Sequence, residues 1–222
     1  MRRLLSYPFS QNTPTYRFSP PIVMYGVRLI ERGDLFNSYR LEMWNHHGTH
    51  IDGPNHADDS WKKLHEFPLD SFFFERPALI DIPMGDSDLA SLEAMQVATA
   101  DLVDPDVILV RSGWTEIRRT DPERYTSSNP GISPDAIRYL LERFPSLRAI
   151  GFDNVSLGAM KRYDENHETH RLWLNPNQPR TDRMIIEDLN LPADLPTPKS
   201  LSAIPLFIEG IDSCWATVIA EV

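Results

Sequence analysis

The sequence predicts an α/β fold in which one domain spans residues 1–222, and two observations support this prediction. Residues 106–111 form a mainly apolar run, which is typical of a strand that is buried on both faces. Residues 134–144 then show helical spacing, and residues 148–152 form a second apolar run. Strand, helix and strand therefore alternate along the chain, as they do in an α/β layer. The length of 222 residues is compatible with a single hydrophobic core.

The remaining strands are predicted from short β-rich runs that proline, glycine and polar residues separate. These runs lie at 22–30, 77–82, 184–191, 203–208 and 215–220. Within the third run, Glu187 follows two isoleucines, and a buried carboxylate is costly unless a cation meets it. We therefore expect Glu187 to face a positively charged group.

Two segments have helical spacing of their apolar residues. Residues 86–97 show it weakly, and residues 134–144 show it clearly. Ser133 is a suitable N-cap for the second helix, and Pro134 fits its first helical position. Pro145 is expected to end this helix, because proline cannot continue the helical hydrogen bonding.

Histidine is concentrated at residues 46–56, His-His-Gly-Thr-His-Ile-Asp-Gly-Pro-Asn-His, which hold four of the seven histidines of the chain. If this segment is extended, its side chains alternate between two faces. The histidines and the carboxylate at even positions then share one face: His46, His50, Asp52 and His56. His47 lies on the other face, so we expect it to be an ordinary structural residue.

These side chains can surround one ion only if the chain bends, because a fully extended segment would hold His46 and His56 about 33 Å apart. Gly48, Gly53 and Pro54 permit a bend, since glycine accepts a positive φ and proline ends ladder pairing. A helix is disfavoured because it would contain all three of these residues. We predict a strand that runs into a bent loop.

The residue types indicate a metal site. Imidazole nitrogens and a carboxylate oxygen, without a nearby thiolate, suit Zn²⁺ and also Mn²⁺ or Fe²⁺. A structural zinc site usually uses several cysteines, whereas this chain has only Cys214, so an open catalytic site is predicted. A single cysteine cannot form an intrachain disulfide, which fits a reducing cytoplasm as the location.

The stretch 46–56 resembles the motif His-x-Gly-Thr-His-x-Asp-x-Pro-x-His of the cyclase family of metal-dependent hydrolases, which contains bacterial kynurenine formamidases and isatin hydrolases. All of its fixed positions are present. The resemblance implies a swivelling β/β/α-type domain with a mixed, barrel-like central sheet and a few flanking helices. It also implies hydrolysis of an amide-like bond in a small aromatic substrate, with arylformamidase activity favoured over isatin, lactam or lactone hydrolysis.

The resemblance further implies a ligand set for one or two Zn²⁺ ions, with Mn²⁺ as a possible alternative. His46, His50 and Asp52 match the ligands of a first ion, His170 matches a ligand of a second ion, and Asp52 and Glu187 match the residues that bridge both. The supporting stretches are His-Arg-x-x-Leu at 170–174 and Ile-Glu-x-Leu-x-Leu at 186–191.

Several neighbouring residues complete the expected site. His56 matches the proton shuttle of the family, and Tyr16 matches an aromatic residue that lines the substrate pocket in an early Thr-Pro-x-aromatic stretch. Trp61 is a second candidate for an aromatic pocket wall. His167 competes with His170 for the role of metal ligand. The loop 175–180 would explain the long interval between His170 and Glu187 as an insertion.

Charge and hydropathy limit the partners. The chain has 32 acidic and 22 basic residues and a formal net charge of −10, which disfavours nucleic acid and anionic membranes. No apolar run approaches the roughly 20 residues that span a bilayer. We expect a small-molecule aromatic amide or lactam as the substrate. The resemblance implies association into a homodimer or a larger homo-oligomer.

Two functions from other classes remain as alternatives. His50, Asp52, His170 and Arg180 resemble the facial triad and arginine of non-haem Fe(II), 2-oxoglutarate-dependent oxygenases. This alternative leaves the other ligand candidates unused, and the predicted helix at 134–144 fits a β jelly roll poorly. The other alternative is a binding module that a metal stabilises and that has no catalytic activity.

Overall fold

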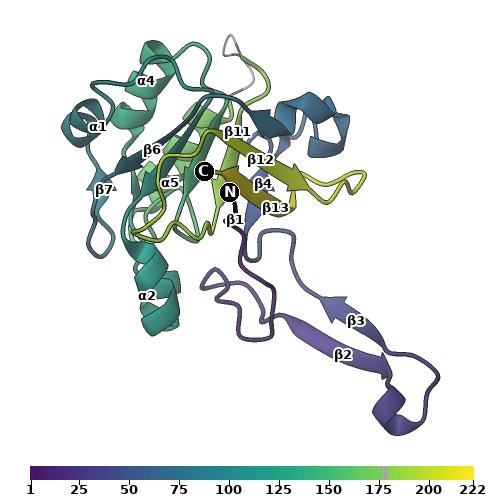
Figure 1. Cartoon of the computed structure of the whole chain (residues 1–222). Coiled ribbons are helices and arrows are strands. Elements are labelled where there is room, and N and C mark those ends of the chain that lie inside the picture. The colour runs from purple at the N-terminus through teal and green to yellow at the C-terminus, as the bar shows by residue number, and fades with distance from the viewer. Residues whose placement is uncertain (176, 178–179) are drawn as a thin grey trace.

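The computed structural model of the chain describes residues 1–175, 177 and 180–222 (Figure 1). Pro176, Gln178 and Pro179 of the predicted loop 175–180 lie outside the described residues. The strands are β1 (Arg2–Leu4), β2 (Val23–Arg28), β3 (Ser38–Glu42), β4 (His50–Asp52), β5 (Phe73–Phe74), β6 (Pro77–Asp81), β7 (Leu89–Ala90), β8 (Val107–Arg111), β9 (Gly131–Ile132), β10 (Ala149–Phe152), β11 (Met184–Glu187), β12 (Ser200–Pro205) and β13 (Ser213–Glu221). The α-helices are α1 (Leu92–Ala98), α2 (Trp114–Thr120), α3 (Pro122–Ser127), α4 (Pro134–Arg143) and α5 (Tyr163–Trp173).

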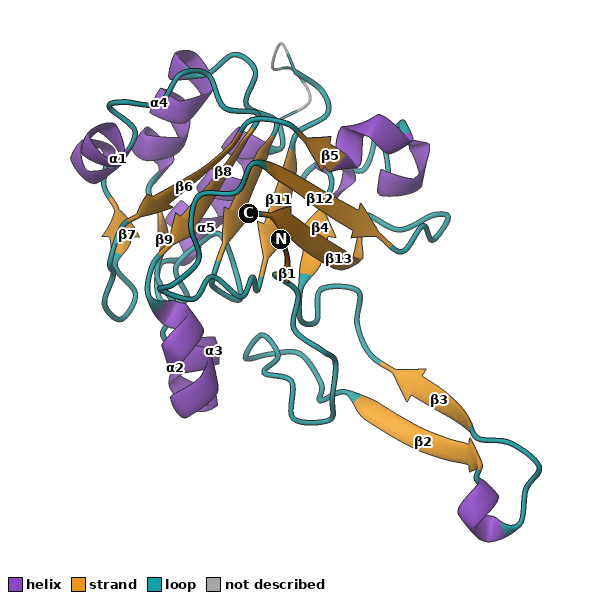
Figure 2. Cartoon of the chain, in the orientation of Figure 1, coloured by secondary structure: helices purple, strands orange, loops and turns teal. Residues whose placement is uncertain are grey.

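A mixed sheet forms the centre of the molecule, and its strand order is β5-β12-β13-β4-β11-β10-β8-β6, with β1 also paired to β13. The strands β6, β8, β10 and β11 run parallel to their neighbours in this group. From β11 through β4, β13 and β12 to β5 the pairing is antiparallel. The predicted α/β fold with a mixed central sheet and flanking helices is confirmed (Figure 2).

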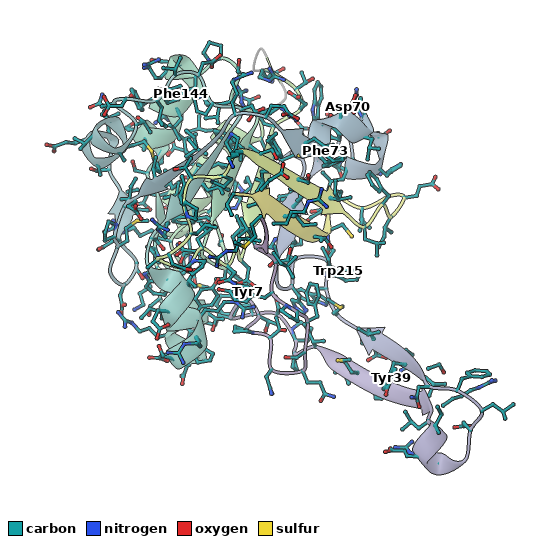
Figure 3. The ribbon with its side chains drawn as sticks, in the orientation of Figure 1. Tyr7, Tyr39, Asp70, Phe73, Phe144 and Trp215 are labelled. Atoms are coloured by element: carbon teal, nitrogen blue, oxygen red, sulfur yellow. The ribbon has the colours of Figure 1, made fainter. Side chains whose placement is uncertain are left out.

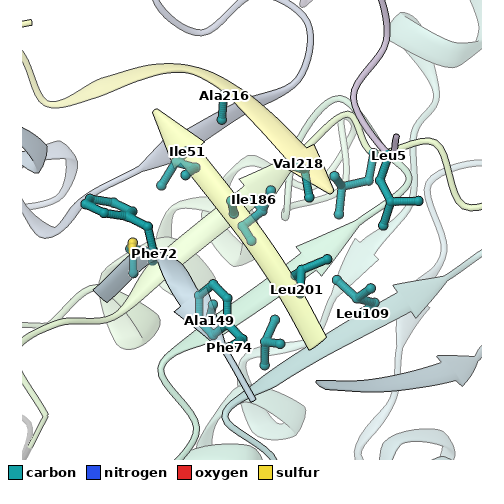
Figure 4. Close-up of a cluster of buried hydrophobic side chains, with 14 of the residues drawn as sticks. Leu5, Ile51, Phe72, Phe74, Leu109, Ala149, Ile186, Leu201, Ala216 and Val218 are labelled. Carbon is teal, nitrogen blue, oxygen red and sulfur yellow. The ribbon is translucent and has the colours of Figure 1, made fainter. Parts of the chain in front are cut away.

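Hydrophobic clusters cover both faces of the sheet, and the alternation along β8 shows why. Val107 and Leu109 point into a cluster with Ile51 and Ile186 on one face, which Figure 4 shows in part. Ile108, on the opposite face, packs with apolar side chains from α1, α4 and α5. A strand that contributes to two cores has to be apolar throughout, as the sequence run 106–111 indicated.

The helix predicted at 134–144 is confirmed as α4. The hydroxyl of Ser133 accepts a hydrogen bond from the amide of Ala136, so Ser133 is the N-cap. The helix predicted at 86–97 begins later than expected. Leu89 and Ala90 instead form β7, which pairs with β9, and α1 starts only after Ser91, whose side chain accepts from the amide of Ala94. This cap terminates the extended backbone and thereby sets the start of the helix.

The apolar run 22–30 forms strand β2 as predicted, but it does not join the central sheet. It pairs only with β3, and the two strands form an arm that extends away from the body of the molecule (Figures 1 and 3). Several large apolar side chains on this arm are exposed, and Figure 3 shows Tyr39 among them. They are Tyr25, Val27, Ile30, Leu35, Phe36, Tyr39 and Leu41. Within the described residues, no helix has the length and apolar character needed to cross a membrane.

Candidate metal centre

Strand β4 lies in the middle of the sheet between β11 and β13, and this position brings distant residues together. In the ladder, His50 stands opposite Glu187 of β11 on one side and Trp215 of β13 on the other. Asp52 stands opposite Ser213 of β13. The polar residues of β4 and β11 therefore meet where the antiparallel part of the sheet joins the parallel part.

The backbone bends on both sides of β4, so the predicted strand and bent loop are present, with a strand of only three residues. Gly48 has a φ of +63°, which is in the left-handed region that favours glycine. After the strand, Pro54–His56 form a 3₁₀ turn that leads the chain back. As a result the ring centroids of His46 and His56 are only 4.5 Å apart.

Two carboxylates and the imidazoles form the centre. Asp52 Oδ1 lies 3.0 Å from His46 Nδ1, 3.3 Å from His50 Nε2 and 2.7 Å from the hydroxyl of Ser213. Glu187 lies 3.4 Å from His50 Nε2 and 3.5 Å from His170 Nε2.

Among the described residues, two overlapping groups have ligand atoms close enough to hold a metal ion. One consists of His50, Asp52 and Glu187, and the other consists of His46, Asp52 and His56. Asp52 belongs to both groups. The ligand candidates inferred from the sequence therefore lie in one place, and His170 adjoins them through Glu187.

The imidazole of His50 fits a metal ligand. Its Nδ1–H donates a 2.8 Å hydrogen bond to the carbonyl of Gly48, so in the neutral imidazole the lone pair is on Nε2. This Nε2 atom is buried and has no hydrogen-bond partner among the described residues, although two carboxylate oxygens face it. A lone pair that faces two anions is unfavourable without a cation between them, and a divalent metal ion supplies that cation.

The pKa shifts also indicate a site that holds positive charge. Burial alone would lower the pKa of His46, but the charge of Asp52 and the hydrogen bond with Asp212 raise it to about 9. In His50, burial alone would also lower the pKa. The nearby carboxylates of Asp52 and Glu187 instead raise this pKa well above its ordinary value. Burial would raise the pKa of Asp52, yet the surrounding histidines hold it well below its usual range. Protons or a metal ion can provide this charge.

Glu187 is anchored to the backbone as well as to the histidines. The amide of Leu157 donates a 2.6 Å hydrogen bond to Glu187 Oε1. Burial and the charge of Asp52 would raise the pKa of Glu187, but the close approach of His170 and His50 lowers it. The expectation that Glu187 faces positively charged groups is consistent with these contacts.

Helix α5 contributes one face to the site. Tyr163, Asn166, His167, His170 and Arg171 recur at helical spacing and all line one cavity. His170 turns its Nε2 toward Glu187, because its Nδ1–H donates to the carbonyl of Asn166. His167 lies at the exposed edge of the same cavity. This geometry favours His170 over His167 as the residue that approaches a metal.

The cavity above the centre has a volume of about 450 Å³. Tyr16 lines it, as expected, together with His46, Asp52, His56 and Glu187. Trp61 is not among the residues that line it, and the indole of Trp61 donates a hydrogen bond to the carbonyl of Thr181. Trp44 lines the cavity instead. Its signal in the sequence is an aromatic side chain two residues before the histidine stretch.

Asp212 is a residue of the centre that the sequence reasoning missed. Its Oδ2 atom lies 2.7 Å from His56 Nδ1 and 3.1 Å from His46 Nε2. Burial would raise the pKa of Asp212, but the hydrogen bonds from both histidines hold it well below its usual range. No local pattern around Gly210-Ile211-Asp212 signals this contact, which depends on the pairing of β13 with β4.

Two arginines, Arg111 and Arg180, lie outside the cavity and pair with carboxylates. Arg111 forms a two-point ion pair with Asp81, at 2.6 and 3.0 Å, and does not line the cavity. Arg180, which the oxygenase alternative requires, is paired with Asp182 and does not line the cavity. The parallel half of the sheet and its covering helices also differ from a jelly roll.

Comparison with known proteins identifies the family. Residues 4–159 match the Cyclase family model, described as "Putative cyclase". This match covers more than half of the chain, so the chain belongs to the cyclase family. The family that the histidine motif suggested is thereby confirmed.

Similar proteins include enzymes and solved structures. A kynurenine formamidase from Geobacillus thermodenitrificans is 29% identical over 179 residues, which cover 79% of this chain and 76% of that protein. The structure of isatin hydrolase A from Labrenzia aggregata, bound to benzyl benzoate, has a TM-score of 0.81 at 21% identity and covers 99% of this chain and 93% of that one. A structure described as a potential metal-dependent hydrolase with cyclase activity has a TM-score of 0.73 at 23% identity. The match covers 99% of this chain and 96% of that one. These likenesses confirm the fold that the motif implied.

Proposed function

We propose that this cyclase-family protein is a metal-dependent hydrolase that opens an amide-like bond in a small aromatic substrate, with an arylformamide as the favoured substrate. The observation that carries the proposal is the buried His50 Nε2 atom, whose lone pair faces the carboxylates of Asp52 and Glu187. The likeness to a kynurenine formamidase and to isatin hydrolase A supports the substrate class.

In the proposed site, His46, His50 and Asp52 would hold a first ion, His170 would hold a second, and the carboxylates of Asp52 and Glu187 would be shared by both. The donor set of nitrogen and oxygen atoms suits one or two Zn²⁺ ions and also fits Mn²⁺. When bound, such an ion activates water at neutral pH and polarises a carbonyl group.

His56 is the proposed proton shuttle. It lines the cavity from the 3₁₀ turn after β4, and its side chain is 33% exposed, so a substrate can reach it. Because its Nδ1 faces the carboxylate of Asp212, its Nε2 is available to exchange a proton. Hydrolysis of an amide requires a proton on the departing nitrogen, and His56 can take this proton from the attacking water and deliver it.

Aromatic residues determine the proposed shape of the substrate site. Tyr16, Trp44 and Tyr163 line the cavity and offer flat apolar surfaces to an aromatic ring. The volume of about 450 Å³ is in the range of a pocket for a small molecule. A compact aryl amide, with its ring against these residues and its carbonyl toward Asp52 and Glu187, fits this arrangement.

The arm of β2 and β3 supports association of the chain with a second copy. A two-stranded ribbon is marginally stable by itself in water. Leu35 is 93% exposed and Val27 is 61% exposed in the single chain, so the arm gains stability if a partner covers it. Acidic and basic residues balance over residues 22–42, with three of each, which suits a homodimer better than a strongly charged partner.

Metal analysis and a substrate panel test the proposal. Elemental analysis of untagged protein should find zinc or manganese, and hydrolysis should be measured on formanilides, N-formylkynurenine, isatin, lactams and lactones. We expect chelation to abolish the hydrolysis of aryl formamides and Zn²⁺ or Mn²⁺ to restore it. Full activity in a verified metal-free sample would reject the mechanism. A large loss of melting temperature on chelation, without turnover of any substrate, would instead identify a binding module, and oxygen uptake with 2-oxoglutarate would identify an oxygenase.

A further inference from the structure

Asp212 lies directly before β13, and the register of the sheet aims its side chain at the histidine stretch. Ser213, the next residue, stands opposite Asp52 in the ladder between β13 and β4. The same oxygen of Asp212, Oδ2, contacts His56 Nδ1 at 2.7 Å and His46 Nε2 at 3.1 Å. One carboxylate oxygen therefore serves two histidines of the proposed site.

The orientation of this carboxylate is fixed by independent contacts. Asn45 Nδ2 donates 2.8 and 3.1 Å hydrogen bonds to Asp212 Oδ1 and to the carbonyl of Ser213. The backbone amide of Gly53 donates a 3.1 Å hydrogen bond to the carbonyl of Asp212. Residues before and after β4 thus hold Asp212 from both ends, which leaves Oδ2 directed at the two imidazoles.

The chemistry of these contacts determines where the protons are. An ionised carboxylate only accepts hydrogen bonds, so each imidazole nitrogen that faces Asp212 Oδ2 carries a hydrogen. In a neutral imidazole the other nitrogen then carries the lone pair. For His46 this nitrogen is Nδ1, which lies 3.0 Å from Asp52 Oδ1. For His56 it is Nε2, and the side chain of His56 lines the cavity.

We propose that Asp212 is a positioning residue that selects the tautomers of both His46 and His56 through one oxygen atom. It presents Nδ1 of His46 to the metal and Nε2 of His56 to the substrate. This inference rests on the roles given to these histidines in the proposed function. Carboxylates that accept a hydrogen bond from a ligand histidine fix the ring and raise its basicity as a ligand. The second contact extends the same effect to the proton shuttle.

Asp212→Ala removes the acceptor, and Asp212→Asn keeps the size and one acceptor oxygen. Glu209→Gln is a matched control, because it removes a carboxylate from the same loop and Glu209 has no contact with either histidine among the described residues. The variants should be compared as zinc-loaded protein by long-range ¹H–¹⁵N correlation spectra of the histidine rings. In the wild type and in Glu209→Gln we expect one tautomer of His56, with hydrogen on Nδ1.

In Asp212→Ala we expect both tautomers of His56 and a 10- to 100-fold loss of zinc affinity in competition with a chelator. At saturating zinc, kcat should fall at least tenfold while KM changes less than twofold, and Asp212→Asn should recover part of the loss. If Asp212→Ala does not fold, the spectra and zinc affinity of Asp212→Asn decide the question.

A double variant separates this inference from the proposed function. Because Asp212 acts on kcat through His56, Asp212→Ala should lower kcat no further in a His56→Ala background at saturating zinc. A single unchanged tautomer of His56, together with zinc affinity equal to that of Glu209→Gln, would overturn the role of Asp212 and leave the hydrolase proposal intact. Full activity of His56→Ala would instead contradict the proposed shuttle.

Discussion

Arg118 and Asp188, the residue that follows Glu187, form a buried two-point ion pair with N–O distances of 2.6 and 2.8 Å. The hydroxyl of Tyr125 donates a 2.5 Å hydrogen bond to the same carboxylate. Asp188 has a φ of +54°, in the left-handed region that few residues other than glycine adopt. The ion pair therefore stabilises a strained residue next to Glu187 and fixes the end of β11.

Substitution of Arg118 by Met should strongly destabilise the protein, because it leaves the carboxylate of Asp188 buried without its partner. Removal of one member of a buried ion pair costs about 3–5 kcal/mol. Arg119→Met is the matched control, since Arg119 is exposed and pairs only at the surface with Glu116, where a pair contributes at most about 1 kcal/mol. Urea unfolding measures the loss of unfolding free energy in both variants. Equal stability of the two variants would refute the role of the ion pair, and Asp188→Asn should partly rescue Arg118→Met.

The ligand and shuttle roles predict opposite effects on metal content and turnover. Asp52→Ala should lose bound metal, because Asp52 belongs to both groups of potential ligands. His56→Ala should retain the metal and lower kcat by about 10²- to 10⁴-fold, the usual range for a general acid or base. Elemental analysis and steady-state kinetics on the two purified variants check this. The reverse pattern would show that the roles are assigned wrongly.

Gly48→Ala should destabilise the protein more than Gly33→Ala. Both glycines have a positive φ, so both substitutions strain the backbone. At Gly48 an added Cβ would also lie 2.4 Å from a ring carbon of Phe9, whereas at Gly33 nothing lies within 4 Å. Thermal unfolding of the two variants isolates the effect of this contact. Equal melting temperatures would mean that Phe9 moves aside without cost.

The ion pair of Arg111 with Asp81 predicts a dependence of stability on acid pH. The hydrogen bond from Arg111 lowers the pKa of Asp81 in the folded state. The unfolded carboxyl group therefore binds a proton at higher pH than the folded one. Its stabilising effect is present above the ordinary Asp pKa of about 4 and is lost as the pH falls through the lowered folded value.

Asp81→Asn should consequently lose less free energy of unfolding than the wild type between about pH 4 and pH 2. The difference is small, because Asp81 is 61% exposed and solvent weakens the interaction. Asp70→Asn is the control, since Asp70 makes no ion pair among the described residues. Urea unfolding at successive pH values measures the slopes. Parallel curves for Asp81→Asn and the wild type would contradict the prediction.

Much of the candidate metal centre could be predicted from the sequence, because most of its residues lie within one short stretch of the chain. His50 and Asp52 share a face because of the two-residue period of strand β4, and His46 and His56 reach them across the bends at Gly48 and at Gly53-Pro54, all within eleven residues. Glu187 was detectable as well, because a carboxylate after two isoleucines requires a buried cation or proton donor. Each of these signals is contained within a few neighbouring residues.

The contributions that depend on strand pairing were not predictable in this way. Asp212 meets His56 only because β13 pairs with β4, and no pattern at 210–212 encodes that register. The run 22–30 has the composition of a core strand, yet it forms the projecting arm, where Ile30 is 58% exposed. Composition indicates that a segment is extended, but it does not indicate which strand becomes its neighbour.

Strand β4 is only three residues long, and its neighbours on both sides are other strands of the central sheet. Its backbone amides can exchange with solvent only if β11 or β13 separates from it, so local fluctuations are insufficient. Hydrogen exchange at His50, Ile51 and Asp52 should thus report the global unfolding free energy. Histidine and carboxylate residues of the proposed metal site thus belong to a segment that we expect to open only with the whole sheet. Mutations that weaken the sheet far from the cavity should then lower the fraction of folded protein before they alter the kinetic constants of the proposed reaction.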